Sequence, residues 1–313
     1  MKVDLKDVKK LREMTGAGVV DCKNALVEAE GDVDRAAEIL REKGIAKTVK
    51  KSGRITAEGL VSSKVEGSKG TMLEVNSETD FVAKNEDFKN FVENMNDLVF
   101  NNDPEDIDSL KSMEVENGKD VETTLKELIA KIGENIVLRR FTKLGADNTY
   151  VAEYNHGGRI AALVELKAND PSVYTDEEFV QLGKDLAMQI TASSPKYVNR
   201  EDVPEEVVEH EKEVLLNQAI NESNENIPAD KREMIAHKKV EGRLNKQLFA
   251  QVVLVEQDYI KDPDKTVGQL LKEKAAKFEG LEVLDFIRYE VGEGLEKREE
   301  DFAEEVSKQM KGE

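Results

Sequence analysis

The chain has 313 residues, enough for about two domains with buried cores. It carries 46 Lys and Arg against 66 Asp and Glu, a formal net charge of −20, which argues against binding to nucleic acid or to an anionic membrane. The single cysteine, Cys22, excludes an internal disulfide framework and indicates a reducing compartment. No apolar run approaches the roughly 20 residues that span a bilayer, and no signal-like apolar core opens the chain. We therefore expect a cytoplasmic protein.

Residues 4–44 are predicted to form three short helices, the last ending at Gly44. Small apolar residues recur at helical spacing in each of them. The stripe of the first helix consists of Leu5, Val8, Leu11 and Met14. Residues 1–53 hold 12 basic and 10 acidic residues, a net charge of +2, so they do not share the acidity of the rest. A bundle this small is predicted to be an interaction module.

From residue 54 the apolar pattern alternates, which predicts strands. A hairpin is expected over 59–65 and 71–76, followed by a helix from about Glu86, a loop over about 101–120, a helix ending at Gly133 and a strand over 134–144. The same order of elements returns over 150–167, in a helix that carries Phe179, in a helix over 266–274 and in a strand over 283–291. We interpret 54–145 and 146–294 as two related copies of one α+β unit with a small antiparallel sheet.

An insertion interrupts the second copy. Two charged helices with narrow apolar stripes lie between Val203 and Leu248, a pattern that favours a projecting antiparallel coiled-coil hairpin. A last helix is predicted to carry Leu295, Phe302, Val306 and Met310. The predicted division of the α+β chain is 1–53 for the three-helix module and linker, 54–145 for the first core subdomain, 146–202 and 251–294 for the second, 203–250 for the hairpin and 295–313 for the C-terminal helix.

Residues that could carry covalent or metal chemistry are scarce. The chain has three histidines, of which His210 and His237 fall on the charged helices and His156 lies in a turn beside two glycines, a place typical of a polar loop residue. Cys22 falls on an apolar stripe and is better explained as core filler than as a nucleophile. No phosphate-binding loop, zinc motif or CxxC pair occurs. We expect no catalytic residue, no metal site and no cofactor.

The segment VNSETDFVAKN, residues 75–85, differs from the rest because Phe81 and Val82 fall between a predicted strand and a predicted helix. One interpretation is that Asp80 caps the helix and Phe81 packs back onto the sheet. The other is that Phe81 is an exposed aromatic anchor beside a carboxylate, as in a binding hot spot. Periodicity leaves both interpretations open.

Several motifs now point to a family. TGAGVVDCKNAL at 15–26 and EVNSETDFVAKN at 74–85, followed in order by AKIGENIVLRR, HGGRI and FIRYEVGEG, closely resemble the bacterial elongation factor Ts family. The resemblance runs essentially end to end. It implies an N-terminal three-helix module similar to ubiquitin-associated domains, a core of two related subdomains, an inserted coiled-coil hairpin and a C-terminal helix.

The resemblance also implies a function, guanine nucleotide exchange on the translation GTPase elongation factor Tu, with that GTPase as protein partner and no small-molecule substrate of its own. It implies that one segment displaces the Mg²⁺ at the nucleotide, that the three-helix module docks on the same GTPase domain and that the second subdomain meets another domain. The matching positions are Thr79, Asp80, Phe81 and Val82 for the first role, Arg12, Val19 and Val20 for the second, and His156 and Gly157 for the third. Valines stand at 19 and 20, where many members have a methionine, and Ser77 replaces a common cysteine.

Two other hypotheses remain on sequence grounds. The three-helix module could serve a scaffold or co-translational adaptor that holds polypeptides, and an enzyme with a divergent site is a more distant alternative.

The acidity is also unevenly spread: residues 86–122 contain 12 acidic residues and three lysines, a net charge of −9. We interpret this acidic segment as a means of keeping the protein away from ribosomal RNA.

Overall fold

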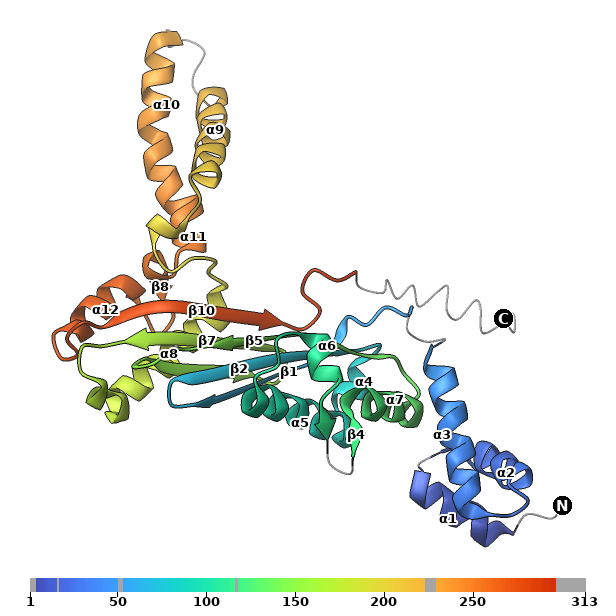
Figure 1. Cartoon of the computed structure of the whole chain (residues 1–313). Helices are drawn as coiled ribbons and strands as arrows, with labels where there is room; N and C mark the ends of the chain where they lie inside the picture. Colours follow the sequence, from blue (N-terminus) through green and yellow to red (C-terminus); the bar gives the residue numbers. More distant parts are fainter. Residues whose placement is uncertain (1–3, 16, 50–52, 116–117, 223–228, 297–313) are drawn as a thin grey trace. The chain divides into compact units, whose positions relative to one another are not determined.

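The computed structural model describes residues 4–15, 17–49, 53–115, 118–222 and 229–296 (Figure 1). These residues form a mixed α and β structure with small antiparallel sheets and a helical N-terminal module, which confirms the predicted α+β class. The chain divides into two compact units. The first contains the described residues up to Ser62, then Met72–Thr142 and the described residues from Tyr289 onward, and the second contains Ser63–Thr71 and Lys143–Arg288. The five-part division above stays a prediction.

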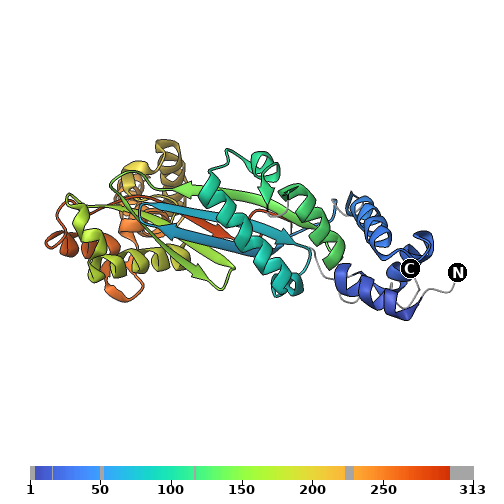
Figure 2. The same cartoon turned by 60° about the horizontal axis from the view of Figure 1, so that its bottom comes forward.

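The N-terminal module consists of α1 (Leu5–Thr15), α2 (Val19–Glu28) and α3 (Val33–Val49) (Figure 2). Its buried core consists of Val8, Leu11, Cys22, Ala25, Leu26, Ala29, Ala36 and Ile39. Two expectations are wrong. Leu5 and Met14 are 82% and 53% exposed, because only the middle of the α1 stripe meets the other helices. The third helix also runs through Gly44, since a lone glycine costs a helix only about 1 kcal/mol relative to alanine.

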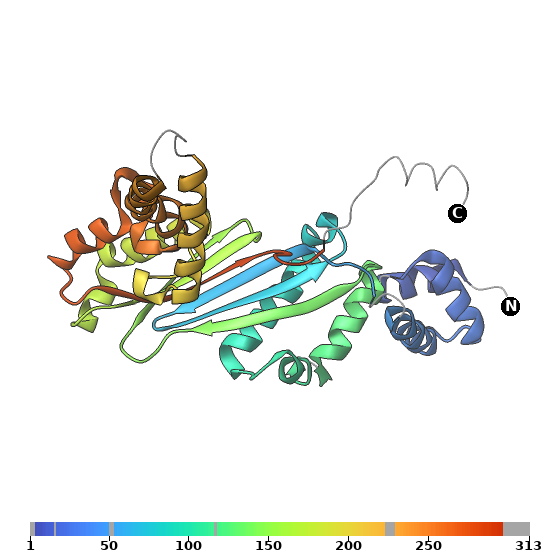
Figure 3. The same cartoon turned by 90° about the horizontal axis from the view of Figure 1, so that it is seen from above.

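The first three-stranded sheet has the order β1-β2-β5, and Figure 3 shows its two blue strands beside the green one. Its strands are β1 (Glu58–Glu66), β2 (Lys69–Ser77) and β5 (Ile136–Leu144). A two-residue turn joins β1 to β2 and includes Gly67 at φ +61, a conformation that glycine adopts without steric penalty. The predicted hairpin and the predicted third strand are therefore confirmed.

Two long helices, α5 (Glu86–Asn102) and α7 (Val121–Ile132), belong to the same part of the chain. Side chains of both, including Phe88 and Leu128, form one buried cluster with Leu73 and Val75 of β2. The region expected to be a loop also contains α6 (Ile107–Lys111) and the antiparallel pair of β3 (Glu114–Val115) and β4 (Lys119–Asp120). These pieces are too short to show a period, and a cap and one buried leucine, Leu110, hold α6 instead.

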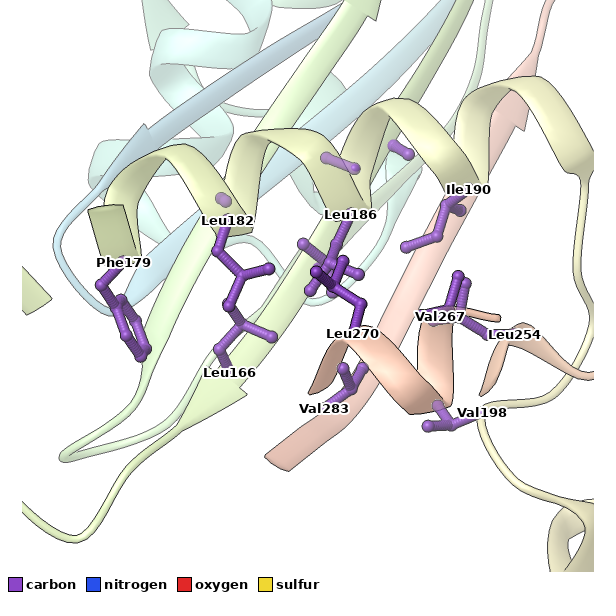
Figure 4. Close-up of a cluster of buried hydrophobic side chains, with 14 of the residues drawn as sticks. Leu166, Phe179, Leu182, Leu186, Ile190, Val198, Leu254, Val267, Leu270 and Val283 are labelled. Atoms are coloured by element: carbon purple, nitrogen blue, oxygen red, sulfur yellow. The ribbon is translucent and has the colours of Figure 1, made fainter. Parts of the chain in front are cut away.

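The second three-stranded sheet has the order β10-β7-β6, with β6 (Tyr150–His156), β7 (Ile160–Lys167) and β10 (Glu282–Glu290). The helices that cover it are α8 (Glu177–Ser193) and α12 (Val267–Ala275). Figure 4 shows the apolar side chains of α8 directed toward Leu166, Leu270 and Val283, with which they form a buried cluster. In both sheets the late strand pairs with the second strand of the hairpin, which supports the predicted repeat.

The charged helices form a pair that stands out from the rest of its unit (Figure 1). We call this pair, α9 (Glu205–Asn221) and α10 (Ala229–Leu244), the arm. Buried side chains of the arm include Leu215 and Ala219 on α9 and Val240 on α10. The chain leaves the arm through a π-helix, η3 (Asn245–Phe249), and α11 (Ala250–Val252).

The remaining short elements are η1 (Pro171–Thr175), η2 (Arg200–Asp202), η4 (Leu254–Glu256), β8 (Asp258–Tyr259) and β9 (Asp262–Thr266). The predicted C-terminal helix, 295–313, lies outside the described residues except for Leu295 and Glu296, which are not helical. Among the helices that the structure describes, none has both the length and the apolar character needed to cross a bilayer.

Candidate partner-binding site

The segment between β2 and α5 contains a single helical turn, α4 (Asp80–Ala83). Thr79 stands at its N-cap in extended conformation, with φ −129 and ψ 159. Asn85 then caps α5 by accepting hydrogen bonds from the backbone N–H groups of Asp87 and Phe88. A turn of four residues carries too few apolar positions to be recognised by period, and the sequence predicted no helix before Glu86.

We call Thr79, Asp80, Phe81 and Val82 the TDFV segment. The exposure of the side chains changes sharply within it. The side chain of Phe81 is 77% exposed, whereas Val82 and Ala83 are 5% and 8% exposed. Val82 packs into the buried cluster behind the first sheet and so serves as the internal anchor of the turn. The alternative in which Phe81 packs onto the sheet does not hold, and the cap position belongs to Thr79 rather than to Asp80.

A lysine that sequence reasoning did not single out accompanies the exposed ring. Lys84 Nζ lies 2.7 Å from Asp80 Oδ2 and 5.5 Å from the centroid of the Phe81 ring. All three side chains are exposed. The turn therefore presents an anion, a cation and an aromatic ring together, a combination suited to contact with another protein.

A carboxylate distant in the sequence holds the start of this turn. Glu134, in the loop between α7 and β5, accepts the backbone N–H of Thr79 at 3.0 Å through Oε2 and the hydroxyl of Thr79 at 2.9 Å through Oε1. In the opposite direction, Glu78 Oε1 accepts the backbone N–H of Asn135 at 2.6 Å. We call these reciprocal bonds between 78–79 and 134–135 the brace.

Further bonds fix the brace to the chain around it. Arg54 Nη1 lies 3.2 Å from Glu78 Oε1, and the Arg54 carbonyl accepts a bond from Asn135 Nδ2 at 3.3 Å. The Ser77 hydroxyl donates to the carbonyl of Thr79 at 2.9 Å. Sequence reasoning missed Glu134 and Glu78. Pairing of β2 with β5 places residues 78–79 beside 134–135, but no local pattern in the sequence indicates which strands pair.

The N-terminal module places its candidate residues at the end of α1 and the start of α2. Arg12 is exposed on α1, and Val19 and Val20 are 52% and 70% exposed on the first turn of α2. Met14 adds another exposed apolar side chain close by in sequence. The module thus buries one set of small residues in its core and leaves a different apolar set in water, as expected of a docking surface.

The remaining candidates, His156 and Gly157, lie in the second unit, at the end of β6 and in the turn that follows. His156 is exposed, and its Nδ1 lies 3.2 Å from the hydroxyl of Tyr154. Gly157 and Gly158 have φ of +60 and +72, and Asn155 Oδ1 accepts the N–H of Gly158 at 2.8 Å. The turn is ordered by its own bonds and presents the imidazole to solvent.

The other residues with chemical potential have structural surroundings. Cys22 is fully buried, and burial raises the pKa of its thiol, which makes it a poor nucleophile. His210 and His237 are exposed on the arm. Within the described ranges no group of three or more His, Cys, Asp or Glu residues is placed to hold a metal ion. The described residues do include exposed apolar side chains at the candidate positions Phe81, Val19 and Val20.

Comparison with known proteins identifies the kind of protein that carries these surfaces. A family model described as Elongation factor TS matches residues 78–293. A relative named Elongation factor Ts from Alkalilimnicola ehrlichii is 48% identical over 314 aligned residues, covering 100% of both chains. A relative of the same name from Clostridioides difficile is 48% identical over 308 residues, covering 97% of each. The chain is a translation elongation factor. It belongs to the elongation factor Ts family, which confirms the resemblance found in its motifs.

Proposed function

We propose that this protein is a guanine nucleotide exchange factor for elongation factor Tu. It binds the GDP-bound GTPase, displaces the Mg²⁺ that bridges the nucleotide phosphates through the TDFV segment, and promotes release of GDP so that GTP can bind. The observation that carries the proposal is the 77% exposure of Phe81 on a turn whose next two residues are buried. A rigidly held aromatic side chain in water is the kind of anchor that dominates protein interfaces.

The kinetics of nucleotide binding explain why such a factor is needed. A nucleotide with a Kd of about 1 nM that associates at about 10⁶ M⁻¹ s⁻¹ dissociates at about 10⁻³ s⁻¹, a half-time of about ten minutes. The factor must therefore weaken the affinity for nucleotide while it is bound. Because such coupling is reciprocal, incoming nucleotide also weakens the binding of the factor and releases it.

Each candidate surface has a part in this proposal. Asp80 and Phe81 enter the GTPase, while Thr79 and Val82 hold the turn that carries them. Arg12, Val19 and Val20 dock the N-terminal module on the same GTPase domain, and the turn at His156 and Gly157 meets another domain.

The proposed role needs no covalent chemistry. We therefore propose an accessory protein that acts in the cytoplasm, without enzymatic activity, cofactor, metal or small-molecule substrate of its own, and without direct contacts to nucleic acid or membrane. Its work consists of binding the GTPase in a form that holds nucleotide weakly.

Phe81→Ala tests the proposal. The exchange rate is expected to fall about 30-fold, since truncation of an interface anchor costs about 2 kcal/mol. The thermal stability should stay unchanged because the ring is exposed. The measurement is release of labelled GDP from purified elongation factor Tu as the concentration of the factor is varied.

Val180→Ala, at a 40% exposed apolar position on α8, is the matched control and should promote GDP release at the wild-type rate. Unchanged release by Phe81→Ala would refute the assignment. If the wild-type factor does not accelerate GDP release at all, nucleotide exchange is excluded and the adaptor hypothesis is favoured.

A further inference from the structure

We propose that Glu134 is a positioning residue for exchange: it holds Thr79 and, through Thr79, the turn that presents Phe81 to the GTPase. The inference rests on the proposed function, because it concerns how the same segment acts. Glu134 lies 55 positions from Thr79 in the sequence, in the motif AKIGENIVLRR rather than in the motif that contains the TDFV segment.

The two hydrogen bonds to Thr79 fix this residue in two ways. One oxygen of the Glu134 carboxylate accepts the backbone N–H and the other accepts the hydroxyl, at 3.0 Å and 2.9 Å. Hydrogen bonds to a charged acceptor are stronger than bonds between neutral groups. One carboxylate therefore holds both the backbone N–H and the side-chain rotamer of Thr79, while the Ser77 hydroxyl holds its carbonyl.

The hydroxyl of Thr79 would ordinarily have another use. A threonine at an N-cap accepts a bond from a backbone N–H of the first turn, yet Thr79 makes no such bond to α4. Its hydroxyl is directed to Glu134 instead. The start of α4 is thus fixed by a contact outside the turn rather than by its own cap.

A helical turn of four residues cannot hold its shape alone, because helix nucleation is unfavourable. The turn has one internal anchor at its far end, where Val82 and Ala83 are buried. Glu134 provides the other anchor, at the near end. With both in place the turn cannot rotate about its axis, and Phe81 faces solvent. Without Glu134, only the buried end and the bond from the Ser77 hydroxyl to the Thr79 carbonyl remain, so the direction of the ring is less well fixed.

Glu134 itself is held firmly. The neighbouring Asn135 is 3% exposed and donates its backbone N–H to Glu78 and its side-chain N–H to the Arg54 carbonyl. These bonds do not involve the Glu134 side chain, so its removal leaves them in place. The Glu134 side chain is only half-buried, and its loss should leave the fold intact.

The test uses the full chain in the labelled-GDP release assay. Glu134→Ala is expected to lower the rate at saturating factor about tenfold, since a misplacement of about 1 Å at a working group costs up to about 100-fold. Glu134→Gln should restore most of the rate, because the amide oxygen can accept the Thr79 N–H and the amide N–H can donate to the hydroxyl. Glu122→Ala, which removes an exposed carboxylate that pairs with Lys126, is the matched control and should behave as the wild type.

A double variant separates positioning from stability. In a Phe81→Ala background, Glu134→Ala should cause no further loss of exchange, whereas any effect on melting temperature should be the same in both backgrounds. Amide hydrogen exchange gives a readout without the GTPase. The N–H groups of Lys84 and Asn85, which donate to the carbonyls of Phe81 and Val82, should exchange faster in Glu134→Ala and normally in Glu134→Gln.

The inference is overturned if Glu134→Ala promotes GDP release as fast as Glu122→Ala does, or if Glu134→Gln fails to restore the rate. It is also overturned if Glu134→Ala lowers the rate by the same factor in the Phe81→Ala background as in the wild type. Unchanged amide exchange in Glu134→Ala would contradict it as well. If Phe81→Ala releases GDP like the wild type while the factor remains active, the proposed role of the TDFV segment fails as well. If Phe81→Ala is slow and Glu134→Ala is not, the positioning role alone is refuted.

Discussion

At the scale of single residues, the most constrained carboxylate is that of Glu74 on β2, which is fully buried. Its Oε1 accepts bonds from Arg139 Nη1 and from the backbone N–H of Gly292, both at 2.8 Å, and its Oε2 accepts one from Arg140 Nε at 2.7 Å. Burial alone would raise the pKa of this carboxyl. The bonds from Gly292, Arg139 and Arg140 outweigh it and hold the pKa below its usual value.

This lowered pKa predicts acid sensitivity. A carboxyl whose pKa is lower in the folded than in the unfolded chain contributes stability above its unfolded pKa. That contribution is lost as pH falls from the usual glutamate value of 4.5 toward the folded pKa. The free energy of unfolding, measured with urea, should therefore decrease steeply below that value.

The variant Glu74→Gln isolates the contribution of the charged carboxylate to stability. Its side-chain NH₂ is a donor and cannot accept the bond that Arg140 donates. The loss should be about 3 kcal/mol at pH 7, as for a buried ion pair that loses one partner, with a shallower acid dependence. Glu93→Gln on the exposed face of α5 is the control and should unfold as the wild type does. Equal urea midpoints for all three proteins would show that Glu74 contributes no net stability.

Residue patterns predicted Phe81 as a candidate but not the brace. The alternation of apolar residues in the sequence reports only which side of a local element is buried, and so it indicated an apolar pair in a connector. The bonds from Glu134 to Thr79 depend on the pairing of β2 with β5, which no local pattern contains.

At the scale of elements, length decides what could be predicted. The 17-residue helices α5 and α8 show four or more turns of apolar period and were expected. The four-residue α4 and the π-helix η3 have no period to detect, and α3 exceeds its predicted end because one glycine costs a helix only about 1 kcal/mol.

The arm is an element with its own contacts. Its base is fixed by Arg200, whose guanidinium makes two bonds to the carboxylate of Glu256, at 2.6 Å and 3.0 Å, and lies 4.5 Å from the centroid of the Phe249 ring. Higher on the arm, Arg243 pairs with Glu222 from helix to helix. The two helices of the arm therefore depend mainly on one another.

Replacement of residues 205–244 by a short Gly-Ser linker is expected to leave the rest of the chain folded. The complex with elongation factor Tu should weaken about tenfold, or about 1.4 kcal/mol, because exposed apolar residues of α10 such as Met234 are lost with it. Titration of labelled GTPase gives the Kd, and circular dichroism checks the fold. An unchanged Kd would exclude the arm from the interface.

At the scale of the whole molecule, the charge of −20 is distributed unevenly. The N-terminal region carries +2 and the acidic segment 86–122 carries −9. A factor that works near ribosomes encounters RNA at high concentration, and like charge suppresses unspecific binding to it. The N-terminal module is thus near neutral, and we expect the acidic remainder of the chain to repel polyanions.

Charge reversal in the acidic segment tests this interpretation. Glu93, Glu105 and Glu114 are exposed, and their replacement by lysine changes the charge of the segment from −9 to −3. RNA affinity, measured by fluorescence anisotropy, should rise roughly tenfold at about 50 mM salt and disappear by about 200 mM. The same weak binding as the wild type at low salt would show that the acidity has another purpose.

The bonds of Glu74 also join parts of the chain that are made at different times during synthesis. Besides the nearby Asn76, its partners Arg139 and Arg140 follow 65 and 66 residues later, and the N–H of Gly292 follows 218 residues later. At about 5–20 residues per second, a ribosome needs roughly 10–40 s to make that stretch. The first unit, which carries the TDFV segment, is thus completed only when nearly the whole chain has left the ribosome. Truncated products that end before Gly292 lack this bond, so the charge on Glu74 is incompletely satisfied in those products.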